Sequence, residues 1–279
     1  MANGDPAAKV TFCYDYQFRP VSVAPGSLTK WQTSLPSTGS NIVSVLVSGG
    51  YLYTGSNGHV YKLDSNGRIV ATNGLPDRGY HEVRLALDGN TLYVGTDGYA
   101  LGLNASNLTT NWQTSLPSTG SNIVSVLASG GCLYTGSDGY VYKLDSNGNI
   151  VATNGLPDRG SHEVRLAIDG NTLFVGTDGY ALGLNASSLE TQWQTSLPNT
   201  GSNIVSVLVL APYVFTGSNG YVYGLNPSDG TILYTNSLSG RGNHEVRLAA
   251  INADGLAIGT DGYALSVNVH PPAPNCQRP

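Results

Sequence analysis

The chain has 279 residues, only 11% of them charged, and a net charge of −5. Nucleic acids and anionic membranes attract basic proteins, so this composition argues against both as partners. No apolar run reaches the roughly 18 residues of a membrane span, and the first residues lack the pattern of a secretory signal. We therefore expect a cytoplasmic or unconventionally secreted protein without membrane insertion.

The first segment in chain order is an N-terminal tail, residues 1–26, in which residues 10–18 (VTFCYDYQF) could form one extra strand. A single domain is expected over residues 27–268, followed by a C-terminal tail, residues 269–279. Cys13 and Cys276 lie in the two tails, and a disulfide between them is an open alternative in an oxidising setting. Cys132 takes the place of Tyr51 in its repeat, which favours a packing role.

Internal repetition organises the domain. Residues 31–111 recur as residues 112–192 with 70 of 81 positions identical, and again more loosely from Trp193. Each unit divides into two halves, because the stretch LYTGSNG at 52–58 aligns with LYVGTDG at 92–98. Six copies of about 40 residues result, a period typical of propeller blades or helical solenoids.

Four segments of the first copy have the pattern of β-strands: residues 42–47, 51–54, 59–63 and 69–72. Each is short, rich in β-branched or aromatic residues, and bounded by residues that suit tight hairpins. No segment has apolar residues at helical spacing. The pattern therefore predicts an all-β, six-bladed β-propeller of four-stranded antiparallel blades, with pseudo-threefold symmetry because each 81-residue repeat supplies two blades.

The two ends of the repeat region predict how the ring closes. The last copy stops after its third strand, at Asn268, and lacks a fourth strand with a tryptophan. Residues 27–40 match the segment that ends at Ser121 but have no blade of their own. We expect residues 31–35 to pair as the outer strand of the sixth blade, which would hide the open strand edges.

The stretch LYVGTDGYAL at 92–101, followed by a turn and Trp112, resembles the quinoprotein-like (PQQ-type) propeller repeat. The resemblance covers the whole repeat region and implies the fold. Enzymes of that family typically have more blades and a cofactor pocket with metal-binding acids. No such pocket pattern is present here, so we expect neither enzyme activity nor a cofactor. The architecture is also similar to that of the propeller lectins of fungi and invertebrates.

Charged residues gather at the start of the inner strand of every second blade. The stretch RGYHEVR at 78–84 recurs in related form at 159–165 and 241–247, and the three copies hold six of nine arginines and three of four glutamates. Because side chains alternate along a strand, Glu82 and Arg84 point to one side. These pairs either lock neighbouring blades together or present donors and acceptors to a polar ligand.

An aromatic residue follows each tight turn between the second and third strands and would add a stacking surface. The third copy keeps these turns and the linkers between blades, whereas two hairpins of the opposite face are altered, which nominates one working face. The candidate ligand-binding residues are Arg78, His81, Glu82, Arg84, Asp97 and Tyr99, with Arg159, His162, Glu163, Arg165, Asp178 and Tyr180, and Arg241, His244, Glu245, Arg247, Asp261 and Tyr263.

This set predicts a multivalent carbohydrate-binding protein, a lectin with about three equivalent sites on one face. Its partners would be glycans or glycoproteins, bound by a monomer or small homo-oligomer, and three weak sites would gain avidity on one surface. The sites could also lie between blades. The main alternative is a protein-interaction scaffold on the same face, and the third is an enzyme with a metal or quinone at the channel mouth.

Metal binding has little support in the pattern. The stretch DSNG at 64–67 and 145–148 opens like a Ca²⁺ loop but lacks the later acidic ligands, which favours a hairpin turn. The three histidines His81, His162 and His244 could hold one Zn²⁺ only if all of them faced the channel. We therefore predict no metal site.

Overall fold

The computed structural model describes residues 29–37, 43–75, 82–120, 122–156, 163–201, 203–238, 240 and 245–269. Regular structure in these ranges consists of β-strands, numbered β1 to β23. No helix long and apolar enough to cross a membrane occurs in the same ranges.

The strands form six antiparallel sheets that follow one another along the chain. The first sheet contains β1 (Ser44–Ser48), β2 (Tyr51–Ser56), β3 (His59–Leu63) and β4 (Ile69–Gly74). The second contains β5 (Arg84–Asp88), β6 (Thr91–Thr96), β7 (Tyr99–Asn104) and β8 (Thr110–Ser115). The third contains β9 (Ser125–Ser129), β10 (Cys132–Ser137), β11 (Tyr140–Leu144) and β12 (Ile150–Gly155). The fourth contains β13 (Arg165–Asp169), β14 (Thr172–Thr177), β15 (Tyr180–Asn185) and β16 (Thr191–Ser196). The fifth contains β17 (Ser206–Leu210), β18 (Tyr213–Ser218), β19 (Tyr221–Leu225) and β20 (Ile232–Ser237). The sixth contains β21 (Arg247–Asn252), β22 (Gly255–Thr260) and β23 (Tyr263–Asn268).

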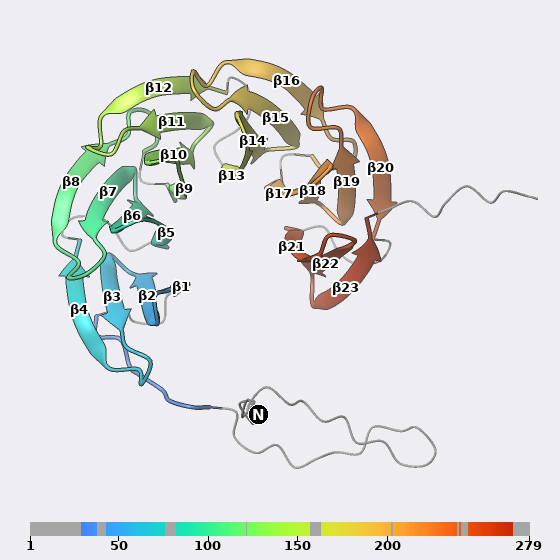
Figure 1. The fold of residues 1–279 in the computed structure, drawn as a ribbon. Coiled ribbons are helices and arrows are strands. Elements are labelled where there is room, and N and C mark those ends of the chain that lie inside the picture. Colours follow the sequence, from blue (N-terminus) through green and yellow to red (C-terminus); the bar gives the residue numbers. More distant parts are fainter. Residues whose placement is uncertain are drawn as a thin grey trace, which may run out of the picture.

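The sheets are arranged around a common centre (Figure 1), with the first strand of each sheet innermost and the last strand outermost. This is the architecture of a six-bladed β-propeller, so the fold that the repeat predicts is confirmed. The sixth sheet has three strands, and Figure 1 shows it apart from the first sheet. Closure of the ring therefore stays a prediction.

The predicted strands of the first copy are confirmed with shifted ends. The first, predicted for residues 42–47, is β1 at Ser44–Ser48, and β2 and β4 each run two residues further than the pattern indicates. β2 is longer because Ser56 pairs with His59 across a two-residue turn, and β4 is longer because Gly74 pairs with the same His59. The turn residues, Asn57 and Gly58, both have positive φ, at 46° and 67°. That geometry matches the right-handed twist of the strands and favours Asn-Gly and Asp-Gly, which recur at the equivalent turns.

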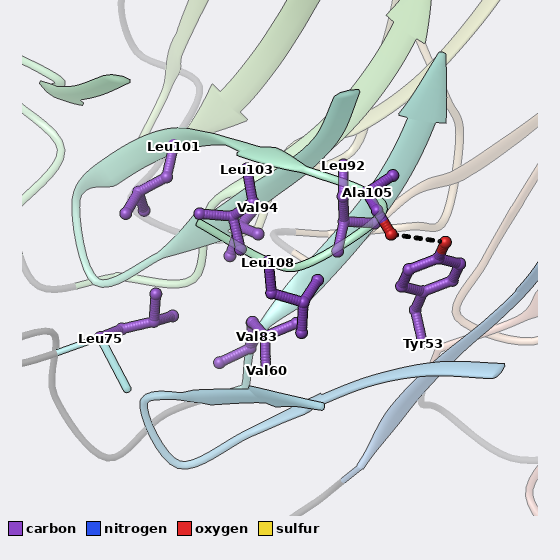
Figure 2. Close-up of a cluster of buried hydrophobic side chains, with 10 residues drawn as sticks. All are labelled: Tyr53, Val60, Leu75, Val83, Leu92, Val94, Leu101, Leu103, Ala105 and Leu108. Carbon is purple, nitrogen blue, oxygen red and sulfur yellow. Dashed lines mark hydrogen bonds between the residues drawn. The ribbon is translucent and has the colours of Figure 1, made fainter. Parts of the chain in front are cut away.

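The hydrophobic core lies between neighbouring sheets rather than within one of them. Figure 2 shows the first such cluster, in which Val60 and Leu75 of the first sheet pack against Val83 and other apolar residues that belong to the second. The hydroxyl of Tyr53 donates a hydrogen bond of 3.0 Å to the carbonyl of Ala105, which joins the same two sheets. Neighbouring blades therefore stabilise each other through shared clusters of buried residues.

Some expectations fall outside the described ranges, namely the strand predicted for residues 10–18 and a disulfide between Cys13 and Cys276. Cys132 is a half-buried free thiol that packs against the cluster between the third and fourth sheets, as its place in the repeat predicts. Residues 31–35 are described, but they form no strand with β23 in the structure.

Buried tyrosines predict how stability depends on pH. Burial raises the pKa of Tyr61, Tyr142 and Tyr223 above the ordinary value of 10.0. A tyrosine whose pKa is higher in the folded than in the unfolded state contributes stability that is fully present below pH 10 and lost as pH rises through the folded pKa. We expect the melting temperature to fall above about pH 10. Calorimetry across pH 8–12 checks this, and Tyr142→Phe should make the fall shallower.

Candidate functional site

The charged residues that the sequence singles out form a chain of ion pairs near the centre of the propeller. The guanidinium of Arg84 contacts Glu82 two residues before it, at 3.1 Å, and Glu163 two sheets further on, at 2.6 Å. Arg165 repeats this arrangement with Glu163 at 3.0 Å and Glu245 at 2.6 Å. Arg84 and Arg165 therefore each link their own sheet to the next sheet that carries this charged pair.

These pairs are largely withdrawn from solvent. The side chains of Arg84 and Arg165 are 18% and 16% exposed, and that of Glu163 is 8% exposed. Burial lowers the pKa of Arg165, and the nearby carboxylate of Glu163 opposes this shift. A charge in such surroundings needs its counter-charge, because an unpaired buried ion is costly.

Serines of the intervening sheets complete the arrangement. The hydroxyl of Ser125, at the start of β9, lies 3.3 Å from the same Glu163 oxygen that Arg84 and Arg165 contact. Ser44 of β1 has the equivalent contact with Glu82, also at 3.3 Å. Around Glu163 the arrangement thus joins three successive sheets, as the blade-locking interpretation of the sequence requires.

The remaining candidate ligand residues divide into two groups. The arginines and histidines at 78, 81, 159, 162, 241 and 244 lie outside the described residues. Asp97 and Asp178 are buried in the turns before β7 and β15, and Tyr99 and Tyr180 begin those strands half-buried. In the sixth sheet the equivalent Asp261 and Tyr263 are exposed.

The sheet register places Tyr99 two strands away from Arg84. Arg84 pairs with Gly95 on β6, and Gly95 in turn pairs with Ala100, the residue after Tyr99. Two strand spacings amount to about 10 Å. The aromatic ring and the charged group therefore lie at the same end of the sheet, but Tyr99 is further from the axis of the propeller than Arg84. Whether these residues bind a ligand stays a prediction.

The same end of the propeller carries a second feature, three linkers with the sequence Leu-Pro-(Ser/Asn)-Thr-Gly-Ser-Asn at residues 35–41, 116–122 and 197–203. The second and third of these lead from the outer strand of one sheet to the inner strand of the next. We call the surface formed by these linkers and by the turns between second and third strands the linker face. Among the described linker residues, the Pro and the following Ser or Asn are exposed in all three copies.

The exposed residue after each proline has a left-handed backbone. The φ angles are 62° at Ser37, 61° at Ser118 and 60° at Asn199. Residues other than glycine adopt this conformation at an energetic cost, and it persists only where the surroundings impose it. The three equivalent exposed turns all lie on the linker face.

Hydrogen bonds hold these turns in place. The hydroxyls of Tyr61, Tyr142 and Tyr223 donate to the carbonyl of the proline in the three linkers. The amide of Asn57 donates to the Ser37 carbonyl at 2.8 Å. On the other flank, the turn at Gly98 packs so closely on the linker that a Cβ there would clash with the Gly120 carbonyl. The described part of each linker, the turn after the proline, is therefore held in place by neighbouring strands.

The sequence prediction named charged side chains and missed the strained Pro-Ser turns. The signal that could have found them is that the third copy keeps the linker almost unchanged while it alters hairpins elsewhere. Among the described residues, no group of three or more His, Cys, Asp or Glu side chains could hold a metal ion. The three histidines considered for zinc lie outside those residues.

The fold and the repeats define a class, the β-propellers built from PQQ-type repeats. The chain belongs to the family described as outer membrane protein assembly factor BamB, whose model matches residues 109–269. The resemblance inferred from the repeat motif is therefore confirmed. A comparison with curated protein sequences finds no match.

Solved structures share the fold at low sequence identity. The computationally designed Ika8 protein aligns with a TM-score of 0.66 and 18% identity, over 81% of this chain and 71% of that one. BamB from Moraxella catarrhalis aligns with a TM-score of 0.60 and 18% identity, over 81% of this chain and 84% of that one. The quinohemoprotein alcohol dehydrogenase ADHIIG from Pseudomonas putida HK5 aligns with a TM-score of 0.54 and 17% identity, over 70% of this chain and 41% of that one.

Proposed function

We propose that this chain is a binding protein without catalytic activity, which holds a protein partner on its linker face. The observation that carries the proposal is the set of three strained, exposed turns at Ser37, Ser118 and Asn199. A surface that is already fixed loses little conformational entropy on binding, so it can contribute affinity without reordering.

Two further points favour a protein as the partner. The family description names an assembly factor, and an assembly factor acts by contacting other proteins. The described arginines and glutamates near the centre are engaged with each other, which leaves hydroxyl, amide and proline groups as the exposed chemistry of the linkers. Such a neutral surface suits an extended, uncharged protein contact.

Glycan binding is the second candidate, favoured by the threefold repetition of the linkers. Exposed Ser118 and Asn122 offer hydrogen-bonding groups on a linker that packs against the turn before half-buried Tyr99. Three such sites on one rigid face would gain avidity on a surface that carries many sugars.

Site-specific photocrosslinking separates the two candidates. A photoreactive amino acid replaces Ser118 on the linker face or, as the matched control, exposed Asn147 in the turn after β11 on the opposite face. In extract of the source cells we expect one protein adduct from position 118 and none from position 147. An adduct that disappears after enzymatic deglycosylation, together with a positive glycan array, would support glycan binding instead. No adduct from position 118 and a blank array would overturn both.

A further inference from the structure

The segment before the first sheet repeats contacts that elsewhere belong to an outer strand. Trp31 packs on Gly67, as Trp112 of β8 packs on Gly148 in the following sheet. The hydroxyl of Thr33 donates to the Gly67 carbonyl at 2.6 Å, and Thr114 makes the same bond to Gly148 at 2.6 Å. Residues 29–34 therefore lie where the outer strand of a sheet preceding the first would lie.

The sixth sheet is the one that has the matching edge. It ends at β23, whereas the equivalent strand β15 is followed by β16. A glycine of the sixth sheet also has empty space where the equivalent glycine of the second sheet contacts the next sheet. A Cβ at Gly95 would clash with the Val124 carbonyl of the next sheet, whereas no described atom lies within 4 Å of a Cβ at the equivalent Gly259.

The first sheet has the complementary surface. Val45 and Val47 on β1 are 67% and 74% exposed. Their equivalents in the second to fifth sheets are partly buried, because the preceding sheet packs on them. Val126, for example, packs against the cluster that includes Tyr93 and Ala100 of the second sheet. The apolar flank of the first sheet thus matches a sheet placed before it.

The chain of ion pairs ends at the same two places. At one end Glu82 contacts Arg84 but no arginine of a preceding charged sheet among the described residues. At the other end Arg247 contacts Glu245 at 2.9 Å, and its side chain is 61% exposed. Arg84 and Arg165 both reach the glutamate of the next charged sheet, and among the described glutamates of these sheets Glu82 is the one left for Arg247.

We propose that the ring closes within one chain: residues 29–34 add to β23 as its fourth strand, and Arg247 reaches Glu82. Closure then completes an alternating ring of six charges around the axis of the propeller and buries Val45 and Val47. The 81-residue repeat gives the register, because Tyr180 pairs with Ser196 in the fourth sheet and the equivalent pair is Tyr263 with Ser34.

Disulfide trapping tests the occupant of this edge. The full chain, with Cys13, Cys132 and Cys276 replaced by serine, receives Tyr263→Cys and Ser34→Cys. The matched control is Tyr180→Cys with Ser196→Cys, a pair already opposed in β15 and β16 at a spacing that suits a disulfide. The negative control is Ser34→Cys with Tyr180→Cys.

On oxidation at low concentration we expect the 34–263 pair to form a disulfide within the monomer as completely as the matched control. Covalent dimers would mean that a second copy occupies the edge and would overturn closure within one chain. No crosslink, while the matched control forms one, would overturn it as well. As a second measurement, Arg247→Ala should lower the melting temperature as much as Arg165→Ala, whereas an exposed arginine with one partner would give almost no change.

Discussion

Replacing Arg165 with alanine is expected to lower the melting temperature by about 5–10 °C. Arg165 lies between Glu163 and Glu245, and its loss leaves two mostly buried carboxylates without their shared counter-charge. Breaking a buried ion pair typically costs about 3–5 kcal/mol. Glu163 keeps Arg84 and Glu245 keeps Arg247, and the side chains are partly exposed, so we expect a cost at the lower end. For a domain of this size each kcal/mol corresponds to roughly 2–4 °C.

The matched control is Arg68→Ala, which removes the same side chain from an exposed turn in the first sheet. It should change the unfolding free energy by less than about 0.5 kcal/mol. Thermal unfolding followed by circular dichroism measures both variants. If Arg165→Ala and Arg68→Ala had the same melting temperature, the ion pairs would contribute nothing to the stability of the fold. The arginines would then again be candidates for hydrogen-bond donors to a ligand.

The fold was readable from the sequence because its signals are local and repeated six times. Hairpins such as Asn57-Gly58 fix the strand pairing, and the alternation of apolar residues decides which side faces the neighbouring sheet. The position of Glu82 and Arg84 on one side of a strand followed from the same alternation and is confirmed by their contact.

The partners of these charges could not be read in the same way. Arg84 meets Glu163, which lies 79 positions away in the sequence and two sheets away in space. Only the curvature of the ring brings them together, and no local pattern reports that curvature. The left-handed backbone of Ser118 could not be predicted for a related reason. Serine ordinarily avoids this conformation, and only tertiary contacts impose it here.

Replacing Trp193 with alanine is expected to cost about 3–5 kcal/mol, within the range for deleting a large buried aromatic side chain. Trp193 is 8% exposed, packs on Gly230 of the next sheet, and donates from its indole nitrogen to the Pro227 carbonyl at 2.9 Å. Its ring also lies 6.0 Å from that of Phe174. The alanine variant therefore loses both a contact within its own sheet and a contact to the following one.

Urea unfolding measures this cost, with Gln194→Ala as the control, since Gln194 is exposed on the same strand. We expect a large shift of the midpoint for Trp193→Ala and almost none for Gln194→Ala. Trp112→Ala should fall between them, because Trp112 has the equivalent packing and a 3.0 Å hydrogen bond to Ser146 but is only half-buried. Equal costs for all three variants would mean that the outer tryptophans do not hold neighbouring sheets together.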